Sequence, residues 1–128
     1  MPYEHHVAYD MKRPLLIVLM FSSIYMSSSA LAYDPLDCID DIAKADEGII
    51  MGLSAELCSG TQSSDPVQCY KDLFKVDSGM IRGIAVDLCA GSTNAKNTIA
   101  CYLKASNRGM IRSLATTLCG AKKQKSNK

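Results

Sequence analysis

Six cysteines carry the most distinctive chemistry of this sequence, because thiols form disulfides, bind soft metals or act as redox pairs. They fall into three pairs with nineteen, nineteen and seventeen intervening residues: Cys38 and Cys58, Cys69 and Cys89, Cys101 and Cys119. Zinc sites usually contain close C-x2-4-C pairs, and redox enzymes a C-x-x-C motif; neither spacing occurs here. The spacing therefore favours disulfides and no metal site, with six reduced thiols around a soft metal as the alternative.

Other catalytic constellations are missing. The only histidines, His5 and His6, precede the segment interpreted below as an export signal, so a serine or cysteine nucleophile would lack its usual base. Two neighbouring carboxylate pairs, at 40–41 and 46–47, are better explained as a solvated helix face and a helix cap than as a glycosidase site. No glycine-rich phosphate loop is present either. We therefore expect neither an enzyme nor a cofactor.

Residues 1–32 are interpreted as an N-terminal extension and a cleavable secretory signal. Lys12 and Arg13 precede a mostly apolar stretch, and Ala30-Leu31-Ala32 has the small-residue pattern of a cleavage site. This predicts a mature chain that starts at Tyr33 and is secreted or periplasmic, where disulfides form. An uncleaved membrane anchor is the alternative, and either Met1 or Met11 could be the start.

The cysteine pairs belong to a repeat of about thirty residues, which indicates repeated supersecondary units. Its units are residues 34–60, 65–91 and 97–120, called units one, two and three below. Ten positions are identical between residues 38–60 and 69–91 without a gap, whereas the two cysteines of unit three are two residues closer in the sequence. A helical domain over 33–120 and a basic disordered tail over 121–128 complete the predicted organisation.

Each unit is predicted to be a helical hairpin. First helices are expected over 35–45, 66–76 and 98–106, after caps at Asp34-Pro35, Asp65-Pro66 and Asn97-Thr98. Second helices are expected to begin at the caps Asp46, Asp77 and Asn107 and to end near glycines, Gly60, Gly91 and Gly120. Their apolar stripe, at i, i+1, i+4 and i+8, starts at Ile49, Met80 and Met110.

Antiparallel helices bring the two cysteines of a unit together, so we predict pairing within each unit. The rival pattern joins Cys58 to Cys69 and Cys89 to Cys101, and it leaves the outermost cysteines too far apart to bridge. A single hairpin cannot bury its apolar stripe, so the units should stack. The predicted fold is all-α: three tandem disulfide-stapled helical hairpins, as a short α-solenoid or a compact six-helix array.

Charge is unevenly distributed along the units. Residues 34–58 contain seven acids and one base, whereas residues 96–128 contain eight bases and no acid. Charged ends that keep the stack in solution are one reading. Docking of the basic end on an anionic envelope or membrane surface is a second, and head-to-tail self-association a third. Nucleic acid is disfavoured as a partner, because no aromatic residue accompanies the bases after Tyr102.

Several basic residues are candidates for binding: Arg82, Arg108, Arg112, Lys122, Lys123 and Lys125. Arg82 and Arg112 occupy equivalent positions, and they either line a binding face or pair with a neighbouring hairpin. The sequence thus favours a secreted, non-catalytic interaction module that presents a rigid helical surface to a protein or envelope partner. The alternative is a membrane-active or host-directed factor that acts through its basic third unit and tail.

Overall fold

The structure, a computed structural model, describes residues 31–122. The predicted signal segment, the choice of start residue and the tail from 123 onward lie outside the described residues. Within 31–122 the chain forms six α-helices and no β-strand, as the repeat predicts. None of these helices combines the length and apolarity needed to cross a bilayer.

The first helix of each hairpin lies close to its predicted bounds: α2 (Pro35–Ala45), α4 (Asp65–Val76) and α6 (Ala95–Asn107). Asp34 caps α2 in a reciprocal capping box with Asp37. The predicted cap at Asn97 is wrong, because the side chain of Asn94 accepts the hydrogen bond from the Asn97 amide. Helix α6 therefore begins earlier than the local alignment of the units predicts.

The second helices are shorter than predicted: α3 (Met51–Cys58), α5 (Arg82–Cys89) and α7 (Arg112–Cys119). Asp46 and Asp77 do not cap them; their backbone N–H groups instead end α2 and α4. Short turns then lead to Ile50, Ile81 and Ile111, which precede the second helices without a side-chain cap and are 61–70% exposed. The predicted apolar stripe is therefore wrong at its second position in every unit.

In units one and two, the second helix ends close to the predicted glycine. Gly60 and Gly91 have φ values of 69° and 76°, a left-handed conformation that glycine adopts without steric cost. Gly120 differs, with an ordinary φ of −67°. A Cβ there would lie 3.0 Å from the Asp87 carbonyl oxygen, so glycine is required in unit three for close approach of the chain to α5.

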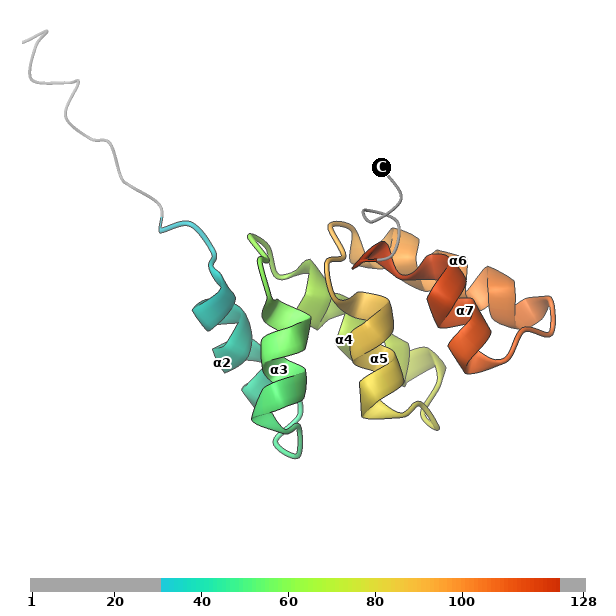
Figure 1. The fold of residues 1–128 in the computed structure, drawn as a ribbon, viewed down its shortest axis with the longest axis horizontal. Helices are drawn as coiled ribbons and strands as arrows, with labels where there is room; N and C mark the ends of the chain where they lie inside the picture. Colours follow the sequence, from blue (N-terminus) through green and yellow to red (C-terminus); the bar gives the residue numbers. More distant parts are fainter. Residues whose placement is uncertain (1–30, 123–128) are drawn as a thin grey trace, which may run out of the picture. The chain divides into compact units, whose positions relative to one another are not determined.

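The hairpins α2–α3, α4–α5 and α6–α7 follow one another in chain order (Figure 1). Between successive hairpins, like helices pack together: α2 against α4 against α6, and α3 against α5 against α7. Stacking of this kind is the packing of an α-solenoid, in which each unit is stabilised by its neighbours. Leu36 at one end and Leu118 at the other remain 74% and 56% exposed, so the terminal units do not close on each other.

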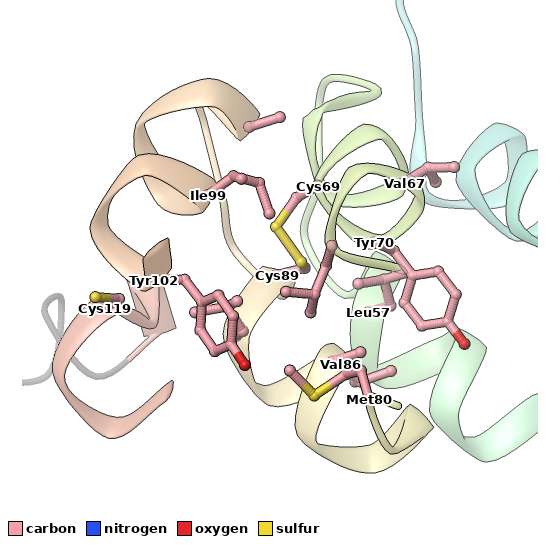
Figure 2. Packing of buried hydrophobic residues seen from close by; sticks show 14 of the residues in the cluster. Leu57, Val67, Cys69, Tyr70, Met80, Val86, Cys89, Ile99, Tyr102 and Cys119 are labelled. Atoms are coloured by element: carbon pink, nitrogen blue, oxygen red, sulfur yellow. A yellow bond between two sulfur atoms is a disulfide. The ribbon is translucent and has the colours of Figure 1, made fainter. Parts of the chain in front are cut away.

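All six cysteines are in disulfides within their own units, which confirms the predicted pairing. The Cα–Cα distances are 5.6, 5.5 and 5.7 Å, within the range that a disulfide spans. Figure 2 shows the Cys69–Cys89 bridge inside the core cluster that also contains Leu57 of unit one and Ile99 of unit three. The disulfides are therefore part of the core as well as crosslinks of each hairpin.

Candidate functional site

The cysteines are engaged in disulfides, which leaves no thiol for metal binding or nucleophilic attack. No group of three or more potential metal ligands occurs within residues 31–122. The most ordered polar chemistry lies instead at the junctions between units. Two of the predicted binding residues, Arg82 and Arg112, are at these junctions.

Each junction contains a carboxylate held by the following unit, an arrangement called the clamp below. Asp46 of unit one accepts hydrogen bonds from the Tyr70 hydroxyl at 2.7 Å and from Arg82 Nε and Nη2 at 2.7 and 2.8 Å. The two arginine contacts form a bidentate pair, the strongest geometry for a guanidinium and a carboxylate. Arg82 thus pairs with the neighbouring hairpin, the second of the two readings of its sequence position.

The second clamp repeats the first. Asp77 of unit two accepts from the Tyr102 hydroxyl, Arg112 Nε and Arg112 Nη2, each at 2.7 Å. Tyr70 and Tyr102 are only 2% exposed and belong to the core cluster, so their hydroxyl groups are the polar ends of buried rings. Figure 2 shows both rings within that cluster. Each clamp therefore connects the core of one unit to the hairpin turn of the unit before it.

The clamp changes the titration of its members. Paired hydrogen bonds from Arg82 lower the pKa of Asp46 from 3.8 to about 2, and Arg112 lowers the pKa of Asp77 to the same value. Burial, together with the hydrogen bond to the aspartate, raises the pKa of Tyr70 and Tyr102. Both carboxylates are therefore ionised at physiological pH, and their oxygens are occupied by donors from the next unit.

The clamp also explains two glycines of the hairpin turns. A Cβ on Gly48 would lie 2.5 Å from Arg82 Nη2, and one on Gly79 would lie 2.9 Å from Arg112 Nη2. Any other residue would push the guanidinium away from its carboxylate. In unit three, Gly109 has no such neighbour and instead adopts a φ of 81°.

Sequence reasoning identified the recurring arginines but missed the tyrosines and assigned the aspartates to helix caps. The sequences of units one and three nevertheless contain an indication of the clamp. Unit one has Ile39 and Met51 where units two and three have the clamp's tyrosine and arginine, and unit three has Asn107 in place of the aspartate. The donors are thus missing from the first of the three units, and the acceptor is missing from the last.

A groove of about 680 Å³ adjoins the first clamp, between units one and two. The apolar residues that line it lie on α4 and on the turn that leads into α5: Tyr70, Phe74, Met80 and Ile81. Tyr70 and Phe74 stack at a tilt, with ring centroids 4.9 Å apart. Lys71 and Lys75 are exposed and contribute positive charge to the same groove, whereas Arg82 is engaged by Asp46.

The other predicted binding residues do not gather with Arg82 and Arg112. Arg108 is exposed at the end of α6. Lys122 is placed within a helical stretch, with Nζ 3.8 Å from Glu56 Oε1, so the predicted disordered tail begins after this residue at the earliest. Lys123 and Lys125 lie outside the described residues. Of the two that the structure describes, Lys122 thus contacts another unit, through its ion pair with Glu56 of unit one.

No protein-family model, curated protein or solved structure matches this chain.

Proposed function

We propose that this protein is an exported, non-catalytic interaction module that binds an acidic, amphipathic helical segment of a partner protein in the groove between units one and two. The observation that carries this proposal is an apolar floor bordered by two exposed lysines, of which Lys75 also pairs with Asp72 at 3.2 Å. Phe74, Met80 and Ile81 supply the floor, and Lys71 and Lys75 supply the charge. Helix-in-groove recognition uses apolar anchors on one helix face and complementary charges beside them.

Ile81 supports a binding role for this groove because it is 61% exposed although it is large and apolar. A partner side chain that covered it would remove apolar surface from water, worth about 25 cal/mol per Å². Asp46 does not offer general-base catalysis in the groove, since Arg82 and Tyr70 occupy its oxygens. The groove is thus better suited to binding than to chemistry.

Export is part of the proposal. Three disulfides are compatible with an extracellular or periplasmic protein. Intact mass spectrometry of protein recovered from outside the cytoplasm tests this: the expected mass is that of residues 33–128 less six hydrogens. A chain that retains residues 11–32, or that carries free thiols, would contradict export by signal cleavage.

Binding is tested with a labelled amphipathic peptide of about 16 residues that has leucines at helical spacing and glutamates between them. Fluorescence anisotropy should show saturable binding that weakens about tenfold or more in Lys71→Glu/Lys75→Glu. The matched control, Lys96→Glu/Lys104→Glu, changes net charge equally but lies away from the groove, and it should change the Kd less than about twofold. Equal losses in both variants would reject the groove as the site.

A further inference from the structure

Unit three exposes leucines at positions where the other units bury theirs. Leu118 is 56% exposed, whereas the equivalent residues Leu57 and Leu88 are fully buried. The three units share one hairpin architecture, and the difference lies in the packing: within residues 31–122, α5 packs on α3 and α7 packs on α5, whereas no helix packs on the outer side of α7. Leu114 is also 53% exposed. The two leucines on α7 are called the unit-three face.

Unit one shows the complementary pattern on its opposite side. Leu36 is 74% exposed, whereas its equivalents, Val67 and Ile99, are only 5% and 9% exposed. These equivalents lie in the first two turns of α4 and α6, each of which packs on the first helix of the preceding unit. Met51 is 70% exposed on the same unit. Leu36, Ile39 and Met51 are called the unit-one face.

Charge at the two faces is complementary in detail. At the junction between units one and two, Asp41 and Lys71 line the same groove. The repeat places Lys104 at the position of Asp41 and Asp40 at the position of Lys71. If unit three stacked on another unit one, Lys104 and Asp40 would take these two places with the order of charges reversed. The acidic composition of unit one and the basic composition of unit three favour the same approach.

We propose that the unit-three face binds the unit-one face of a second copy of this chain, in the register that units use within one chain. Such a contact is heterologous, so each added copy leaves one face of each kind open and the assembly grows head to tail. The junction would bring Asn107 to Ile39 and Met51 in place of a clamp. It therefore buries no unpaired clamp charge, but it is weaker than the junctions inside the chain. This proposal does not depend on the groove between units one and two.

Sedimentation velocity on the oxidised protein tests the assembly. The weight-average mass should rise with concentration between about 10 µM and 1 mM at low salt. It should fall back toward the monomer at about 0.5 M salt, because the approach of acidic and basic units is screened. A monomer at every concentration in low salt would overturn the proposal.

Two single-face variants test the direction of assembly. Leu36→Glu blocks the unit-one face and Leu118→Glu blocks the unit-three face; both sites are exposed enough to accept a charge without unfolding. Each variant alone should be monomeric, and an equimolar mixture should form dimers and nothing larger, because one good face of each kind remains. The control Val76→Glu, at an exposed residue outside both faces and outside the groove, should assemble as the wild type does.

The remaining outcomes separate this assembly from its rivals. Asp40→Lys should weaken association about tenfold or more, and adding Lys104→Asp in the same chain should restore it. A dimer that either single-face variant still forms by itself would show an isologous contact and overturn the proposal. So would a protein that stays monomeric while it binds vesicles rich in anionic lipid through Leu118, since that face would then be a membrane-docking surface.

Discussion

Replacing Asp46 by asparagine measures how much the first clamp stabilises the stack. The change preserves the shape of the side chain but removes the charge that Arg82 and Tyr70 bind. A pKa of about 2 in the folded chain against an ordinary 3.8 corresponds to roughly 2 kcal/mol at 1.36 kcal/mol per unit. Because the Arg82 side chain is 49% exposed, solvent screens the pair, and we expect a loss of about 1–2 kcal/mol in the free energy of unfolding.

The assay is urea unfolding followed by circular dichroism with the disulfides intact. Asp46 binds fewer protons folded than unfolded, so its stabilisation is complete above pH 3.8 and is lost as the pH falls through about 2. The difference between wild type and Asp46→Asn should therefore be full at neutral pH and shrink over this acid range. Glu47→Gln, an exposed neighbour in the same turn, is the control and should cost less than about 0.5 kcal/mol. A neutral-pH loss below about 0.5 kcal/mol, or one that persists unchanged in strong acid, would refute the reasoning.

Four further changes are predicted to alter the stability, two of them lowering it and two raising it. Gly48→Ala should destabilise the protein by about 1–2 kcal/mol, because the added Cβ displaces the guanidinium of the clamp. Gly52→Ala should stabilise it by up to about 1 kcal/mol, because Gly52 lies in open space within α3. The urea unfolding midpoints of the two variants test both expectations. Thr116→Val should raise the thermal midpoint, with a gain of about 1 kcal/mol, because the buried Thr116 hydroxyl lacks a hydrogen-bond partner. Cys101→Ala/Cys119→Ala should cost about 3 kcal/mol, with the earliest loss of amide-exchange protection in α6 and α7; uniform loss over all units would contradict a unit-by-unit stack.

The cysteine spacing and the repeat were sufficient to predict the hairpins and their disulfides. Both features are periodic, so each unit independently supports the same interpretation. The start of α2 after Asp34 was also predicted, since local capping chemistry determines it, whereas the predicted cap Asp65 lies inside α4, after an N-cap residue, Ser64, that makes no side-chain capping bond. These are the parts of the structure that depend on interactions near in sequence.

The start of the second helices could not be read from local pattern. Asp46 resembles a helix cap, but its carboxylate binds Tyr70 and Arg82, which are 24 and 36 residues away. Local sequence preferences assign such a residue to the cap of the next helix, because they take no account of contacts with a neighbouring hairpin. The groove between units one and two was missed for a related reason: the turn between α4 and α5 brings Phe74 and Ile81 together, and the stacking of units adds Asp46 to the same groove.

The disulfides and the clamps couple different parts of the same array. Each disulfide lies within a unit, whereas each clamp lies between units. In a one-dimensional nearest-neighbour description, the disulfides therefore contribute to the stability of each unit by itself, and the clamps contribute to the interaction energy between neighbouring units. A reducing environment would weaken every hairpin and leave the coupling in place. Strong acid would leave the hairpins crosslinked and remove the clamps' share of the coupling, while the apolar contacts between units remain, so that unfolding would become less cooperative. The array would thus lose cooperativity in strong acid and local structure under reducing conditions.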